Sequence, residues 1–383
     1  MSEAPIDTRK TAPLAAQYVR PGKTTRLISD YQGARELLRN PNARQAGAGT
    51  DLLDISKTEE VGLFYLDGEA HRKKRAVISK YFTLRVIETR YHDIMVRTTD
   101  RLIERLRRDG EGYLDKMGFE LAVAVASEVI GLDFSDLEGL SERVAATQGE
   151  ADGRLPVRDN EDAAIKTFFE KDVKPSIELR RANRGEDVIS RLLDYGWSDK
   201  AILTEVIAYS VAGMATTREF LAMTAWYLFE RPDMLERFKH GTEDEQFAIL
   251  EEVLRLEPIV GALIRHAAED IDSPACGHIP KGTRIVIDVR AANMDEAATG
   301  PCPHLIDPDR ARTTPDRSGF MSFGDGPHRC PGAQLSFHEA RIFFEKLFAV
   351  PGIKLAKVPS IHWYRPISGY ELHDALITCD KVT

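Results

Sequence analysis

The chain has 383 residues, of which 43% are hydrophobic and 30% are charged, and its formal net charge is −9. The negative charge argues against general nucleic-acid binding, which relies on basic surfaces. No apolar run is long enough to span a bilayer and residues 1–16 contain no apolar signal core, so we expect a cytoplasmic protein.

Length alone suggests two domains, but no Pro-, Ser- or Gly-rich linker divides the chain. We therefore expect a single domain over residues 1–383, mainly α-helical, with a smaller β-rich part. The β-rich stretches are expected near residues 20–30, 258–295 and 353–383. The four cysteines are widely spaced and predict no disulfide framework.

The chain begins with elements that are short. Residues 25–28 predict a strand, and residues 30–38 predict a helix that ends before Asn40-Pro41. Residues 43–66 form a loop rich in Gly and Asp, with no helical or strand periodicity. In a single sequence, such a loop can be an ordinary solvent loop or part of a binding site.

A helix is predicted to open at Asp67 and to run to about Phe82. His71 and Arg75 stand four residues apart in it, so they share one face. The basic residues between them, Arg72–Lys74, lie on other faces. They belong either to a solvated helix surface or to a positive patch that docks an acidic partner protein.

Three helical stretches follow, and they differ in how apolar they are. Residues 84–108 predict a long amphipathic helix, whereas residues 119–132 are apolar nearly all round and predict a buried one. Residues 137–181 predict two weaker helices around a polar break at residues 149–160.

A helix of about thirty residues is predicted at residues 199–230, with Ser198 as its N-cap and Pro232 beyond its end. This is more than twice the usual helix length, so the helix must cross most of the protein. Small and hydroxyl-bearing residues interrupt its middle in the order Ala212-Gly213-Met214-Ala215-Thr216-Thr217. Taken alone, this pattern also fits a crossing point between two packed helices.

The next helix, at residues 243–256, carries Glu252 and Arg255 on one face, three residues apart. Strands are predicted at residues 260–265 and 283–291. Short strands around a turn at Ser368-Gly369 are predicted for residues 353–378.

A glycine-rich loop near the C-terminal end holds one cysteine and leads into an amphipathic helix. Its sequence is Phe323-Gly324-Asp325-Gly326-Pro327-His328-Arg329-Cys330-Pro331-Gly332. Pro331 suits a first helical turn, which would place Cys330 at a helix N-terminus. Unpaired N–H groups and the helix dipole stabilise a thiolate there, and a thiolate is a strong axial donor to haem iron.

This loop resembles the haem-binding signature of the cytochromes P-450, Phe-Gly-x-Gly-x-His-x-Cys-x-Gly, at every fixed position. Three further motifs follow the order of the family, and the resemblance extends from about Ser29 to the C-terminus. It is closest to the soluble bacterial type. The resemblance implies the cytochrome P-450 fold, with haem b between the long helix and the helix after the Cys330 loop.

The resemblance implies that Cys330 is the proximal iron ligand and that Phe323 covers its sulfur. Gly324 and Gly332 allow the backbone to approach a flat cofactor. Basic side chains would hold the two haem propionates, because cations neutralise carboxylates. These residues are His71, Arg75, Arg265 and His328.

On the opposite face of the haem, the resemblance assigns oxygen activation to Ala212, Gly213 and Thr216. Thr216 would place a hydroxyl beside dioxygen. Ala215 departs from the family pattern, which has an acid here to relay protons. We therefore expect Thr216 with ordered water, or a polar substrate group, to deliver protons, and oxygen activation to be slower or less well coupled.

The resemblance also predicts a structural ion pair and a substrate pocket. Glu252 and Arg255 would be joined by an arginine of the later meander, with Arg310 as the first candidate and Arg312 as the second. The pocket would be apolar and fairly roomy. Its candidates are Ala208, Val211, Ala212, Gly261, Leu263 and Ser368.

The function implied is monooxygenation of a small, largely apolar organic substrate. No flavin or nicotinamide module is recognised, so electrons from NAD(P)H would arrive through a separate ferredoxin and ferredoxin reductase.

Three alternatives are less favoured. One is a peroxide-driven haem-thiolate enzyme or a haem isomerase, for which Ala215 is a mild hint. Another is a non-catalytic haem sensor or carrier. A third is a zinc protein using Cys302, His304 and His278, although a second closely spaced ligand pair is missing.

Overall fold

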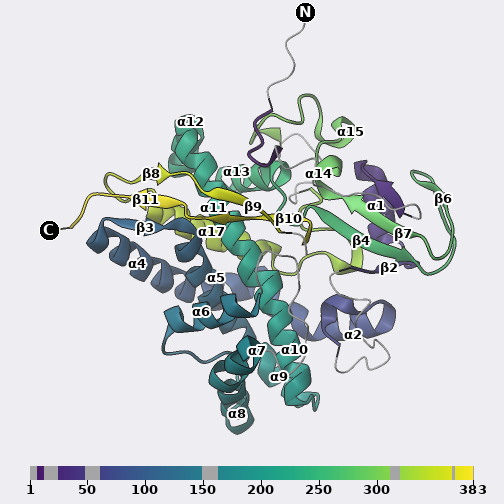
Figure 1. Cartoon of the computed structure of the whole chain (residues 1–383), viewed down its shortest axis with the longest axis horizontal. Coiled ribbons are helices and arrows are strands. Elements are labelled where there is room, and N and C mark those ends of the chain that lie inside the picture. The colour runs from purple at the N-terminus through teal and green to yellow at the C-terminus, as the bar shows by residue number, and fades with distance from the viewer. Residues whose placement is uncertain are drawn as a thin grey trace, which may run out of the picture. The chain divides into compact units, whose positions relative to one another are not determined.

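A computed structural model of the chain describes residues 7–12, 25–47, 61–148, 163–310, 320–364 and 367–382. These residues form many helices and four small sheets (Figure 1), as the sequence predicts. No helix in these ranges has the length and apolar character needed to cross a membrane.

Two compact units make up the chain, and each joins segments that are far apart in the sequence. Unit 1 comprises Met1–Asp51, Met223–Cys330 and Ile361–Leu372. Unit 2 comprises Leu52–Ala222, Pro331–Ser360 and His373–Thr383. The expectation of one domain over the whole chain stays a prediction.

Unit 1 contains a four-stranded sheet in the order β1-β7-β4-β2 (Figure 1). β1 (Thr25–Ile28) runs parallel to β7 (Arg284–Asp288), whereas β4 (Ala262–Ala267) is antiparallel to β7 and to β2 (Ala43–Gln45). Alternate strand residues point to one core, which explains why the isoleucines of β1 and β7 are buried with α1 (Tyr31–Arg39).

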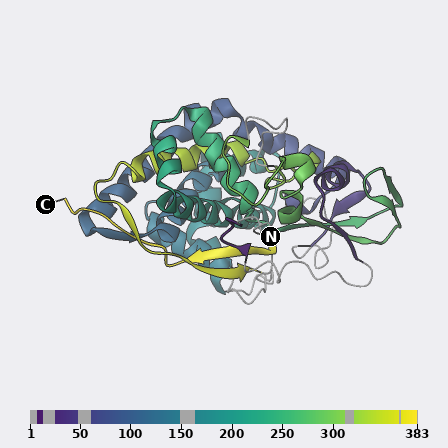
Figure 2. The same ribbon diagram turned by 90° about the horizontal axis from the view of Figure 1, so that it is seen from above.

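Several helices of unit 1 begin at a side-chain cap, among them α1, α13 (Glu243–Leu256), α14 (Val289–Ala292) and α15 (Glu296–Thr299). Thr242 and Glu245 form a capping box at the start of α13. The remaining elements of this unit are α12 (Pro232–His240), α13 (Glu243–Leu256), α14 (Val289–Ala292), α15 (Glu296–Thr299), η8 (Gly326–His328), β5 (Ile271–Ser273) and β6 (Gly277–Ile279). β9 (Ser360–Tyr364) and β10 (Gly369–His373) pair with each other, and Figure 2 shows them in yellow.

Unit 2 is mostly helical, and its helix α5 (Leu114–Ile130) is buried along most of its length. Its first elements are η3 (Leu63–Tyr65), α2 (Gly68–Ser79), η4 (Lys80–Phe82), α3 (Leu84–Val86), η5 (Ile87–Tyr91), α4 (His92–Asp109), β3 (Glu111–Tyr113) and α5 (Leu114–Ile130). Its later elements are α6 (Leu137–Thr147), α7 (Ala163–Phe168), η6 (Phe169–Val173), α8 (Lys174–Ala182), α9 (Val188–Asp194), α17 (Ala333–Leu347), β8 (Lys354–Lys357) and β11 (Leu376–Thr378).

The long helix follows the predicted bounds but has three parts: α10 (Asp199–Tyr209), the π-helix η7 (Ser210–Ala215) and α11 (Thr216–Glu230). Ser198 is its N-cap, and its hydroxyl accepts a hydrogen bond from the Ala201 N–H at 3.2 Å. Apolar periodicity predicts the length of such a helix, but it does not reveal the extra residue that a π-helix accommodates.

Several boundaries differ from the prediction. The strand at residues 283–291 stops at Asp288, because the Asp288 carboxylate caps α14 by accepting the Ala291 N–H at 3.0 Å. Pro331 lies outside a helix, since α17 begins at Ala333 with Gly332 as its N-cap. The polar break at residues 149–160 and most of the loop at residues 43–66 lie outside the described residues.

Candidate functional site

The loop that carries Cys330 is a compact turn in unit 1. The Cys330 N–H donates to the Phe323 carbonyl at 2.9 Å, which closes the loop on itself. Gly324 and Gly326 have φ of +65° and +66°, a conformation that favours glycine. A side chain at Gly326 would also collide with the Leu38 carbonyl, so this glycine allows the loop to contact the end of α1.

Asp325 ties the same loop to α1, which sequence reasoning missed. Its carboxylate lies 2.9 Å from Arg39 Nε and 3.6 Å from Arg35 Nε, and it accepts the Gly326 N–H at 2.7 Å. Arg39 is well exposed, so its share of the ion-pair energy is modest. The partners are almost 300 positions apart, so no local pattern predicts the contact.

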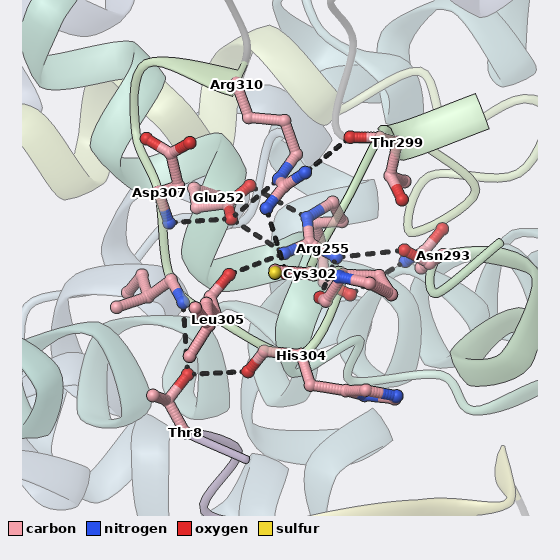
Figure 3. Close-up of polar contacts among 12 residues, drawn as sticks. Thr8, Glu252, Arg255, Asn293, Thr299, Cys302, His304, Leu305, Asp307 and Arg310 are labelled. Atoms are coloured by element: carbon pink, nitrogen blue, oxygen red, sulfur yellow. Dashed lines mark hydrogen bonds and ion pairs between the residues drawn. The ribbon is translucent and has the colours of Figure 1, made fainter. Parts of the chain in front are cut away.

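The predicted ion pair is fully buried, and Figure 3 shows its polar contacts. Arg255 makes two hydrogen bonds to Glu252, at 2.7 and 2.8 Å, and Arg310 Nε lies 3.4 Å from the same carboxylate. Arg255 also donates to the carbonyls of Pro303 at 2.7 Å and Leu305 at 3.2 Å. The three residues lie together, while Arg312 is outside the described residues.

Asn293 connects this network to the Cys330 loop. Its amide donates to the Arg255 carbonyl at 3.1 Å and to the Ser322 hydroxyl at 2.9 Å. The side-chain oxygen of Asn293, Oδ1, accepts the Met321 N–H at 2.9 Å. The buried charges therefore position the backbone just before Phe323, which is where the loop begins.

Two further predicted residues of unit 1 lie on β4. Leu263 and Arg265 are two apart in the strand and so share one face. The Leu263 side chain is the nearest group to Gly324, 3.6 Å from the position a Cβ would take there. Arg265 is only 3% exposed, while His328 and Cys330 are half-buried.

In unit 2, His71 and Arg75 lie on α2, where His71 is 2% exposed and Arg75 is half-buried. Burial raises the pKa of Tyr209 well above its ordinary value, and the positive charge of Arg75 opposes that shift. Arg75 therefore lies near Tyr209, the residue of the long helix that comes just before the π-helix.

The predicted oxygen-activation residues lie in and beside that π-helix. The Thr216 hydroxyl donates to the Ala212 carbonyl at 2.7 Å, and the Thr217 hydroxyl donates to the Gly213 carbonyl at 2.6 Å. Ala212 is exposed, and a Cβ on Gly213 would meet no atom within 4 Å. Short π-helices inserted in an α-helix often mark functional sites.

Glu205 is a functional candidate that the sequence analysis missed. It is buried on α10, one turn before Ala208, and its carboxylate accepts the Leu63 N–H at 2.8 Å. The Lys74 ammonium lies 3.9 Å from it, donates to the Val61 carbonyl at 2.5 Å and lies over the Trp197 ring. Lys74 is therefore packed into the unit rather than forming part of an exposed basic patch.

Comparison with known proteins agrees with these features. The sequence profile of the cytochrome P-450 family matches residues 247–349. The biotin biosynthesis cytochrome P-450 of Bacillus subtilis is 27% identical over 367 residues, covering 92% of this chain and 87% of the relative. The vitamin D(3) 25-hydroxylase of Pseudonocardia autotrophica is 26% identical over 338 residues, covering 84% and 79%.

Among solved structures, the crystal structure of P-450 BioI in complex with an acyl carrier protein ligated to hexadec-9Z-enoic acid has the same fold. Its TM-score is 0.77 at 23% identity, with 92% of both chains covered. The chain is a cytochrome P-450. It is therefore an oxidoreductase of a family that binds haem.

The Cys330 loop of this cytochrome P-450 has the chemistry of a haem-thiolate ligand. Cys330 forms no disulfide, and the glycines of its loop leave the thiol half-buried at the end of a closed turn. The π-helix presents small side chains with room beside Gly213. The described residues contain no group of three potential metal-ligating side chains, so Cys302, His304 and His278 do not form the alternative zinc site.

Proposed function

We propose that this cytochrome P-450 inserts one oxygen atom of dioxygen into a small, largely apolar organic substrate, with Cys330 as the proximal ligand of haem b. The observation that carries the proposal is the closed Cys330 loop, which matches the haem-binding signature and is braced by a buried ion-pair network. That network keeps the thiolate in place because its charges are fully hydrogen-bonded.

Basic residues would hold the haem carboxylates. Arg265 and His71 are buried, and basic side chains bind carboxylates through charge-assisted hydrogen bonds. Arg75 and His328 are half-buried and complete the set of proposed propionate contacts. When bound, the haem supplies the reductive activation of dioxygen.

Proton delivery is assigned to Thr216. Its hydroxyl donates to the Ala212 carbonyl, which leaves the oxygen lone pairs able to accept a hydrogen bond from water. Ala215 has no carboxyl group to feed this position, so we propose that ordered water or a polar substrate group supplies the protons.

The substrate is proposed to be apolar because the pocket candidates are. Ala208, Val211 and Leu263 offer only aliphatic surface, and Gly261 and Ser368 add little bulk. The names of two relatives, which refer to biotin biosynthesis and to vitamin D(3) 25-hydroxylation, support an organic substrate.

We propose that electrons come from NAD(P)H through a separate ferredoxin and its reductase. The test is to find a substrate by its spin-state change in the visible spectrum, then to measure product formed with ferredoxin, reductase and NADH. Product in proportion to NADH consumed supports the proposal. Equal product from hydrogen peroxide alone, with none from the reductase system, would favour a peroxide-driven enzyme, for which Ala215 is the specific hint.

A further inference from the structure

Arg290 is a buried arginine that the proposed function does not use. It lies on α14 in unit 1 and is 4% exposed. Its Nη1 donates to the Ser368 carbonyl at 3.0 Å, and its guanidinium lies 5.7 Å from the centre of the Trp363 ring on β9. Arg290 therefore joins α14 to Ser368, the residue just before β10.

Gly261 makes this contact possible. A methyl group on Gly261 would overlap both the Arg290 guanidinium and the Ser368 carbonyl, so no other residue fits without a shift. The Gly261 carbonyl also accepts the Val289 N–H at 3.0 Å, which fixes the start of α14 beside it. The glycine is needed here for space.

The turn at Ser368 is strained and held from two sides. Ser368 has φ of +46°, which is uncommon for a residue with a side chain. Such a conformation persists where the surrounding structure determines it. Arg290 bonds the Ser368 carbonyl, and the buried Tyr370 hydroxyl donates to the Glu257 carbonyl at 2.9 Å.

A charged partner lies close to Arg290. Burial raises the pKa of Asp288, and the positive charge of Arg290 partly offsets that rise. The planar fork of an arginine bonds in fixed directions, so a lysine could supply the charge without the same geometry.

We propose that Arg290 is a specificity-determining positioning residue, whose guanidinium holds the Ser368 turn against Gly261 and so sets one wall of the substrate pocket. The inference rests on the proposed function, because the pocket roles of Gly261 and Ser368 belong to it. Loss of the hydrogen bond from Arg290 to the Ser368 carbonyl frees the turn. The shape of the substrate pocket then changes, while Cys330 keeps its place.

The test compares Arg290→Met, Arg290→Lys, Gly261→Ala and the double variant Arg290→Met/Gly261→Ala. Arg284→Met is the matched control, since Arg284 is exposed on β7. Two probes are titrated into the haem-loaded proteins: imidazole, which needs only the iron, and a phenyl-substituted imidazole, which must also fit the pocket. Hydrogen–deuterium exchange of residues 363–372 follows the turn itself.

We expect Arg290→Met and Gly261→Ala each to speed exchange in the turn and to weaken the phenyl-bearing probe about tenfold, while imidazole binding stays unchanged. Arg290→Lys recovers only part of the loss. The double variant is no worse than the worse single variant, because both changes break one contact.

Unchanged exchange and an unchanged ratio of the two dissociation constants in Arg290→Met, with a normal carbon monoxide spectrum, would overturn the inference alone. Absence of a thiolate-type carbon monoxide band in the unmodified protein would overturn the proposed function, and this inference with it.

Discussion

The Cys330 loop and the middle of the long helix are built in opposite ways. The loop is fixed by backbone hydrogen bonds, by the Asp325 ion pairs and by the Glu252 network that reaches it through Asn293. The π-helix η7 has small side chains, and its threonine contacts are local bonds to carbonyls four residues back.

The difference separates two requirements of one enzyme. A metal ligand must stay within a fraction of an ångström of its position, which needs many satisfied polar contacts around it. The role proposed for the long helix, facing the substrate, requires room, which small residues and a π-helix supply.

The largest effect is expected from Arg255→Ala. The substitution removes both Arg255 hydrogen bonds from the buried Glu252 carboxylate, and it removes the donor of the Pro303 and Leu305 carbonyls. Breaking the buried pair costs about 3–5 kcal/mol, and the carbonyls add to that cost. We expect protein that no longer retains haem or folds stably in denaturant titrations. Lys281→Ala is the control, because it removes an exposed pair with Glu269 and should change stability by less than about 0.5 kcal/mol.

Glu339 on α17 is expected to make stability depend on pH. The residue is 3% exposed, none of the described residues donates to its Oε1, and desolvation raises its pKa to about 8. Because the folded protein binds this proton more tightly than the unfolded chain does, stability is lost as pH rises from the ordinary pKa to about 8 and levels off above it.

Glu339→Gln mimics the protonated form. Between pH 5 and pH 8 the variant should gain roughly 3 kcal/mol over the unmodified protein, measured as free energy of unfolding in urea at each pH. A variant that tracks the unmodified protein across this range would show that the carboxyl is paired or hydrated.

Much of the Cys330 loop could be predicted from sequence because its signals are local. The loop is recognised by Gly324, Gly326 and their spacing to Cys330, and these residues lie within seven positions of the sequence. The partners of Asp325, Glu205 and Arg290 could not be predicted, since each contact joins segments that only the fold brings together.

Ala215→Asp should sharpen the π-helix side of the contrast. A carboxylate next to Thr216 would feed protons to its hydroxyl, so we expect several-fold less hydrogen peroxide released per NADH consumed. Equal or greater peroxide release in the variant would mean that the missing acid does not limit coupling.

The smallest effect is expected on α2, where neighbouring lysines differ in burial. Lys74 contacts Glu205 and the Trp197 ring, so Lys74→Met should cost about 1 kcal/mol of stability. Lys73→Met removes only an exposed pair with Glu69 and should stay within about 0.5 kcal/mol. Similar values for both variants would argue that Lys74 does not hold the segment at Val61–Leu63.

The bond between the Cys330 sulfur and haem iron is the central claim, and a carbon monoxide difference spectrum of the reduced protein tests it most directly. The unmodified protein and Cys302→Ala, a change at an exposed cysteine, should give the long-wavelength band of thiolate-ligated haem. Cys330→Ala should lose that band, and an unaltered spectrum in Cys330→Ala would contradict the account.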